Sequence, residues 1–253
     1  MYVKLGRLVS AALAGLVLLS GSACGSGKEE GAVTVFAAAS LTESFTKIGK
    51  DFEAANPGTK VTFNFAGSSA LATQINQGAP ADLFASAAPA NMKTVTDTGN
   101  AEDTPVTFAK NQLVIAVRKG NPKGITSLAD LARPGLKIAL CAEQVPCGAA
   151  AKKALDGAKV KVAPATLEQD VKAALTKVKL DEADAALVYR TDAKAASAEV
   201  QAIEFPESAS AVSEYLVVVL KKAPNKKGAE AFLAHVRSDK GMAALTGAGF
   251  QAP

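Results

Sequence analysis

The chain has 253 residues, with 28 lysines and arginines against 24 aspartates and glutamates, and a formal charge of +4 at pH 7. A signal-like segment at residues 1–23 contains two of the basic residues, Lys4 and Arg7, and without it the formal charge is +2. This near-neutral balance, without runs of like charge, argues against nucleic acid or an acidic membrane surface as a partner. The remaining length suits one large domain or two small lobes.

The N-terminus has the features of an export signal. Its basic start precedes an apolar stretch at 8–19 that is too short to span a bilayer comfortably. The next segment, LSGSACG at 19–25, resembles the lipobox of bacterial lipoproteins, whose cysteine is lipidated, although Gly21 stands where leucine is usual. We therefore predict a lipoprotein signal peptide at 1–23, lipidation of Cys24, a flexible tether at 24–32, and anchoring to the outer face of the cell membrane. The alternative is a plain secretory signal with an incidental cysteine.

Strand and helix patterns alternate along the rest of the chain, which is typical of an α/β protein. Between Leu41 and Phe52, for example, apolar residues recur at steps of four, three and four and form one face of a helix. The predicted strands are 33–36, 60–65, 82–85, 113–117, 137–140, 185–188, 201–205 and 215–220. The predicted helices are 41–52, a short helix through 71–75, 91–98, 127–133, 148–155, 171–178, 227–236 and 238–245.

Two turns rich in small residues and serine lie where a predicted strand gives way to a helix, at 36–43 and 65–71. The first N–H groups of a helix have no partner within it, and the helix dipole adds partial positive charge there, so each junction suits an anion. The hydroxyls of Ser40 and Ser68 would add donors. The alternative is ordinary helix capping, because Ser40 and Glu43 fit the S-x-x-E capping box and Ser68 or Ser69 suits an N-cap.

Three further junctions follow the same pattern. They are 145–148, 168–171 and Tyr189 directly after the strand at 185–188, and in open α/β sheets ligands bind at such carboxyl ends of strands. None of the five junctions contains a lysine or arginine except Arg190. A site built there would hold its anion with neutral donors.

Two cysteines remain besides Cys24. Cys141 and Cys147 form an even pair in an exported protein, which makes them a disulfide candidate, and two unpaired buried thiols are the alternative. Their spacing does not fit C-x-x-C redox chemistry. A structural zinc site is not expected either, because His235 is the only histidine.

Five stretches of the chain resemble, in order, the motifs of molybdate-binding proteins of bacterial ABC transporters. The resemblance covers essentially the whole mature chain. It implies a type II periplasmic-binding fold, in which two lobes enclose an oxyanion in a cleft. The stretches are VTVFAAASLT (33–42), FAGSS (65–69) with GAPADLF (78–84), VPCG (145–148), QDV (169–171) and LVYRTDA (187–193).

The resemblance also implies which residues bind the anion. Ser40 and Ser68 would each donate a hydroxyl and a backbone N–H, Cys147 and Val171 a backbone N–H, and Tyr189 its hydroxyl. All are contacts to oxyanion oxygens, not metal ligands. Position 147 is more often alanine in the family, which a main-chain contact tolerates.

Chain order implies that the first lobe is discontinuous, comprising 33–111 and 213–253, and that the second lobe is 112–212. The two crossings near Asn111 and Val212 would form the hinge. The implied protein is a monomer without a cofactor that delivers molybdate or tungstate to a transporter permease.

Neutral donors suit molybdate and tungstate, which are fully deprotonated dianions at neutral pH. Hydrogen phosphate carries a proton and needs an acceptor, whereas sulfate must be rejected by size. Both remain alternatives, as does an anion sensor. An enzyme is not expected, because neither Ser40 nor Ser68 lies in a G-x-S-x-G elbow and His235 is the sole histidine.

Overall fold

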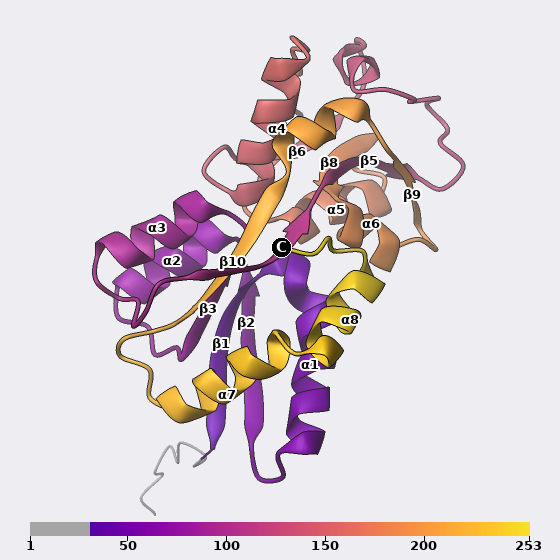
Figure 1. Ribbon diagram of the computed structural model, residues 1–253. Helices are drawn as coiled ribbons and strands as arrows, with labels where there is room; N and C mark the ends of the chain where they lie inside the picture. The colour runs from indigo at the N-terminus through magenta and orange to yellow at the C-terminus, as the bar shows by residue number, and fades with distance from the viewer. Residues whose placement is uncertain (1–30) are drawn as a thin grey trace, which may run out of the picture.

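The computed structural model describes residues 31–253 and contains two five-stranded sheets, each flanked by helices, which form two lobes (Figure 1). Each sheet has buried apolar clusters of its own. The α/β class and the two-lobe architecture predicted from the sequence are thus confirmed. The predicted signal peptide, the lipidation of Cys24 and residues 24–30 of the predicted tether lie outside the described residues.

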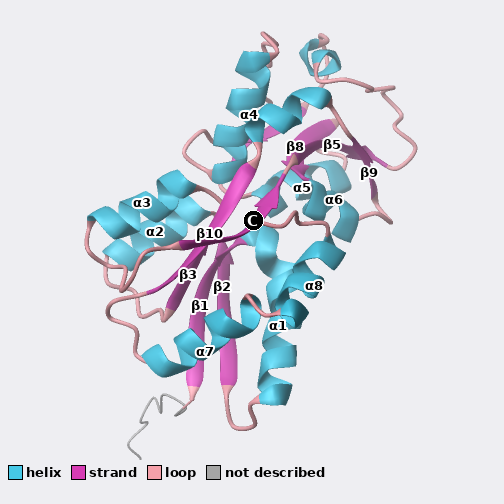
Figure 2. Ribbon diagram, viewed as in Figure 1, coloured by secondary structure: helices cyan, strands magenta, loops and turns pink. Residues whose placement is uncertain are grey.

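The first sheet combines strands from both ends of the described chain. In spatial order they are β2 (Lys60–Ala66), β1 (Ala32–Ala38), β3 (Leu83–Ser86), β10 (Ser213–Val219) and β4 (Val106–Asn111). The first three run parallel, and β10 is antiparallel to both of its neighbours. One face packs against α1 (Thr42–Ala55), α7 (Lys226–Val236) and α8 (Asp239–Ala248) (Figure 2). The other face packs against α2 (Ser68–Asn76) and α3 (Pro89–Asp97).

The second sheet repeats this order of strand directions. Its strands are β7 (Thr166–Glu168), β6 (Ile138–Cys141), β8 (Ala185–Tyr189), β5 (Leu113–Arg118) and β9 (Val200–Ile203). Here β7, β6 and β8 run parallel, and β5 is antiparallel to both of its neighbours. The helices of this lobe are α4 (Pro146–Gly157), α5 (Val171–Lys179) and α6 (Arg190–Ala195), with the short 3₁₀ turns η2 (Ala129–Ala132) and η3 (Pro206–Ala211).

In each sheet the antiparallel strand enters from the other lobe. Gln112 alone separates β4 of the first sheet from β5 of the second, and Val212 alone separates η3 from β10. The two crossings lie side by side, because Asn111 pairs with Ser213 in the sheet register. The lobes are therefore joined by two adjacent, nearly extended strands.

Besides the 3₁₀ turns η1 (Ala39–Leu41) and η3, two strands and one α-helix were not predicted. The strand β4 was missed because only one residue separates it from β5, so no turn signal marks the boundary. The edge strand β7 has three residues and leaves Leu167 57% exposed, so it shows no buried face. The helix α6 has six residues, fewer than the roughly 11 over which a helical pattern of apolar residues can be recognised. The predicted helix at 127–133 is only the 3₁₀ turn η2, held by Asp130, whose carboxylate accepts from the N–H groups of Thr126 and Ser127.

Candidate functional site

Four helix N-termini meet at one small cavity between the lobes, which we call the interlobe cavity. The first lobe contributes the 3₁₀ turn η1 (Ala39–Leu41), which leads into α1, and the start of α2. The second lobe contributes the starts of α4 and α5 and the end of β8. The cavity is small, with a volume of about 10 Å³. It is lined by Ala38, Ala39, Ser40, Ala66, Gly67, Ser68, Ala87, Val145, Pro146, Cys147, Asp170, Val171 and Tyr189.

The two serines of the first lobe do not cap helices. The N-cap of α1 is Leu41 and that of α2 is Gly67, and neither helix has a side-chain cap. The hydroxyl of Ser40 instead lies 2.7 Å from the Tyr215 hydroxyl, and the hydroxyl of Ser68 accepts from the N–H of Ala87 at 3.0 Å. The capping alternative considered from the sequence was therefore wrong, and both side chains are available to the cavity.

The second lobe presents mainly backbone donors. Val171 is the first residue of α5, and Cys147 is the second residue of α4, after Pro146, which has no N–H. Backbone N–H groups in the first turn of a helix have no partner within that helix. The carboxylate of Asp170 accepts from the N–H of Ala173 at 2.9 Å, which fixes the start of α5. These two helix starts thus offer N–H groups in fixed positions.

A disulfide joins Cys141, at the end of β6, to Cys147 in the first turn of α4, as the sequence predicted. The neighbouring Gly148 lies against the connecting loop, since a Cβ atom there would be 2.0 Å from the carbonyl oxygen of Ala142. The covalent link and this close backbone approach together hold the N-terminus of α4 against the sheet.

Tyr189 is 1% exposed, and its hydroxyl lies 3.0 Å from that of Ser213. Burial raises the pKa of the Tyr189 phenol well above its usual value, and the nearby carboxylate of Asp192 acts in the same direction. The hydroxyl consequently keeps its proton at neutral pH. It can serve as a hydrogen-bond donor from the second lobe.

No lysine or arginine lines the interlobe cavity, and Asp170 is its one charged residue. Arg190 follows Tyr189 but directs its guanidinium to both carboxylate oxygens of Glu204, at 2.8 Å each. Lys172 follows Val171 and lies 2.7 Å from the Glu43 carboxylate and 2.9 Å from that of Asp192. The cationic groups beside the cavity are thus already paired with carboxylates.

The lobes touch each other around this cavity. A Cβ atom on Gly67 would be 2.2 Å from the carbonyl oxygen of Gln169 in the opposite lobe. The side-chain amide of Asn91 donates to the carbonyl oxygen of Gln144 at 3.3 Å, which is a second contact across the gap. Ala39 packs into the apolar core of the second lobe. The structure therefore shows the lobes in a closed arrangement.

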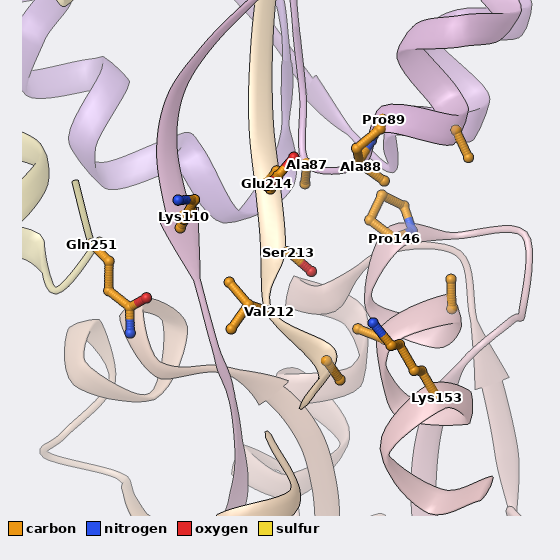
Figure 3. Close-up of a pocket in the computed structure, with 14 residues that line it drawn as sticks. Ala87, Ala88, Pro89, Lys110, Pro146, Lys153, Val212, Ser213, Glu214 and Gln251 are labelled. Atoms are coloured by element: carbon orange, nitrogen blue, oxygen red, sulfur yellow. The ribbon is translucent and has the colours of Figure 1, made fainter. Parts of the chain in front are cut away.

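A larger groove opens beside the interlobe cavity and shares Ala87 and Pro146 with it. Its volume is about 640 Å³. Figure 3 shows Lys153 on α4 on one side of this groove, and Lys110 on β4 on another. The groove differs from the cavity in its larger volume and in the basic side chains that line it.

Residues 33–251 match the family described as bacterial extracellular solute-binding protein. The chain belongs to this family. It is 45% identical to the molybdate-binding protein ModA of Mycobacterium tuberculosis, with 97% of each chain covered. The periplasmic molybdate-binding protein of Azotobacter vinelandii has the same fold, with a TM-score of 0.73 at 22% identity over 87% of this chain and 99% of that one. The sulfate-binding protein SubI of M. tuberculosis matches with a TM-score of 0.74 at 19% identity, over 87% and 86% of the chains.

Family membership supports the prediction of an extracellular binding protein at this general level. Between residues 31 and 253, no helix has the length and apolar character needed to cross a membrane. The same residues contain no group of three or more histidines, cysteines or acidic residues arranged to hold a metal ion. His235, the residue a serine-type catalytic site would need, lies on α7 with its ring against Phe52.

Proposed function

We propose that the protein captures molybdate, and tungstate with it, for an ABC importer. The observation that carries this proposal is the lining of the interlobe cavity, where three hydroxyls and four helix-terminal N–H groups converge without a basic side chain. A fully deprotonated dianion accepts hydrogen bonds on every oxygen, so it matches a ring of neutral donors. The relatives named as molybdate-binding proteins support the same choice of ligand.

Ser40 and Ser68 bind the anion with hydroxyl and N–H groups from the first lobe. Cys147 and Val171 bind it with N–H groups, and Tyr189 with its hydroxyl, from the second lobe. The protein supplies hydrogen bonds only, so it needs no cofactor and catalyses no reaction.

The lobes open to admit the anion, because in the closed arrangement they touch each other around the cavity, at Gly67 and Gln169 and at Asn91 and Gln144. We assign the moving parts to 33–111 with 213–253 and to 112–212, hinged at the crossings near Asn111 and Val212. Donors from both lobes make the closed form bind more tightly, so the ligand shifts the population toward it. Small-angle scattering then gives a smaller radius of gyration with saturating molybdate, and an unchanged curve with binding confirmed would contradict closure.

The mature protein is a monomer tethered through lipid on Cys24 to the outer face of the cell membrane, where it meets the transporter permease. Mass spectrometry of the membrane-extracted protein tests the anchor. The expected result is a diacyl-sized increase on the N-terminal peptide. An unmodified cysteine or cleavage at another site would contradict it.

The second candidate is a phosphate-binding protein, which one observation favours. Asp170 lines the interlobe cavity, and only one of its carboxylate oxygens is used to cap α5. A free carboxylate oxygen is the acceptor that hydrogen phosphate would need. Its partly solvated position at the helix start argues for a structural role instead.

Calorimetric titration of the untethered, ligand-stripped protein with molybdate, tungstate, sulfate and phosphate at constant ionic strength tests the proposed function. Molybdate and tungstate should bind at least ~100-fold more tightly than the other two anions, a difference of about 2.7 kcal/mol. Tighter binding of phosphate or sulfate would overturn the assignment.

A further inference from the structure

Two residues outside the predicted site contact it from the strand β10. Ser213 and Tyr215 are two positions apart on this strand and therefore face the same side of the sheet. The hydroxyl of Tyr215 lies 2.7 Å from that of Ser40, and the hydroxyl of Ser213 lies 3.0 Å from that of Tyr189. All four side chains are buried, with exposures of 6% or less.

We propose that Ser213 and Tyr215 are positioning residues that make Tyr189 and Ser40 act as hydrogen-bond donors to the oxyanion, an inference that rests on the proposed function. A hydroxyl carries one proton and two lone pairs. When Tyr215 donates to Ser40, the remaining proton of Ser40 is directed into the cavity. Ser213 acts in the same way on Tyr189.

The geometry of Tyr215 suits this role. Its ring makes edge-to-face contacts with Phe108 and Phe250, with centroids 6.3 and 5.2 Å away, so the phenol oxygen is held in place. Burial raises the pKa of this phenol well above its usual value, so it keeps a proton to donate. The opposite polarity, with Ser40 donating to Tyr215, would turn a lone pair of Ser40 toward the anion and repel it.

The arrangement also affects selectivity. With one lone pair of Ser40 occupied by Tyr215, the serine is poorly placed to accept the proton of hydrogen phosphate. Removing the Tyr215 hydroxyl frees that lone pair and lets Ser40 rotate. The Tyr215→Phe variant should therefore lose affinity for molybdate and discriminate less against phosphate.

A double-mutant cycle measured by calorimetry tests the inference. Tyr215→Phe should weaken molybdate binding about 2- to 10-fold in the parent, the effect expected for one neutral hydrogen bond. In the Ser40→Ala background the same change should cause no further loss. Ser213→Ala should likewise weaken molybdate binding in the parent and cause no further loss in the Tyr189→Phe background. This second cycle tests the inference if Tyr215→Phe does not fold.

Ser208→Ala is the matched control, because this serine is also buried but bonds to the carbonyl oxygen of Phe205 and does not line the interlobe cavity. Its molybdate affinity should equal that of the parent. Equal losses from Tyr215→Phe in both backgrounds would show a purely structural role and overturn the inference, as would no loss in the parent. A parent that binds none of the oxyanions would instead refute the proposed function, so the two failures are distinguishable.

Discussion

The two lobes line the interlobe cavity with different chemistry. The first lobe presents serine hydroxyls on rotatable side chains. Their hydrogen-bond partners, Tyr215 and Ala87, lie elsewhere in the sequence. The second lobe presents mainly main-chain N–H groups at helix starts that a disulfide and the Asp170 cap hold in place. Substitutions of the serines in the first lobe should therefore weaken anion binding by removing hydroxyl donors. Substitutions in the second lobe should weaken it mainly by displacing backbone N–H groups.

The contact between the lobes offers the strongest way to break this arrangement. In Gly67→Ala the new methyl group would meet the carbonyl oxygen of Gln169 at 2.2 Å when the lobes close. The backbone of Gly67, at φ −60° and ψ 135°, is ordinary for alanine, so the first lobe itself should fold normally. We expect molybdate affinity to fall by about 100-fold or more, as overpacking commonly costs up to ~3 kcal/mol.

Small-angle scattering should show Gly67→Ala remaining open with molybdate at a concentration that closes the parent. Gly157→Ala is the control, because the added methyl group there meets no atom within 4 Å outside its own helix backbone and chain neighbours. Parent-like affinity and closure in Gly67→Ala would show that the lobes do not approach as described.

Removing single hydroxyls tests the side-chain donors that the two lobes present to the interlobe cavity. Ser40→Ala, Ser68→Ala and Tyr189→Phe should each reduce molybdate affinity about 10- to 150-fold, since a hydrogen bond to a charged group contributes about 1.5–3 kcal/mol. The serine variants keep their backbone N–H groups, and Tyr189→Phe keeps its ring. Calorimetry on the three variants measures the effect. If all three bind as tightly as the parent, the anion lies elsewhere.

Loss of the disulfide should reduce molybdate affinity less than loss of a hydroxyl, and only by displacing the backbone N–H of Cys147. Cys147→Ala retains the main-chain N–H, so its direct cost is small, and any loss should be reproduced by reducing the unmutated protein. So short a loop is expected to contribute somewhat less than ~3 kcal/mol to the free energy of unfolding. Calorimetry compares the molybdate affinity of Cys147→Ala with that of the unmutated protein with and without reductant. A large loss in Cys147→Ala that reduction does not reproduce would mean that the side chain itself contacts the ligand.

Lys172 should have the smallest effect on binding. It joins the two lobes through Glu43, whose side chain is 51% exposed, and such ion pairs contribute about 0–1 kcal/mol. Lys172→Met should therefore change molybdate affinity by less than about 5-fold. The loss should shrink further at high salt. A salt-independent loss above tenfold would indicate a direct role in the site.

The carboxyl of Asp192, which pairs with Lys172, should make the free energy of unfolding depend on pH. Burial raises the pKa of the Asp192 carboxyl to about 6, although Lys172 acts to lower it. A carboxyl with a higher pKa in the folded state binds more protons there, so its contribution to the free energy of unfolding falls as pH rises from about 4 to about 6. Urea denaturation across this range should show the decline. Asp192→Asn should remove the decline, and Lys172→Met should extend it to higher pH, because the folded-state pKa of Asp192 rises without the lysine. An Asp192→Asn profile parallel to that of the parent would contradict this assignment.

The sequence predicted most of the cavity because its lining is local. Each helix start follows a strand after a connection of at most four residues, and the small residues around Ser40 and Ser68 mark two of the junctions. Contacts that depend on tertiary structure were not predicted. Ser40 and Tyr215 are 175 residues apart, and no motif links them. The need for glycine at position 67 arises only when Gln169 of the other lobe approaches.

The central claim is that one oxyanion is held by both lobes, and anomalous scattering from crystals grown with molybdate tests it most directly. Data collected at the molybdenum absorption edge should give one strong peak inside the interlobe cavity. Its oxygens should lie within hydrogen-bond distance of the five predicted donors, namely Ser40, Ser68, Cys147, Val171 and Tyr189. A peak in the larger groove beside Lys110 and Lys153, with none in the cavity, would contradict the account.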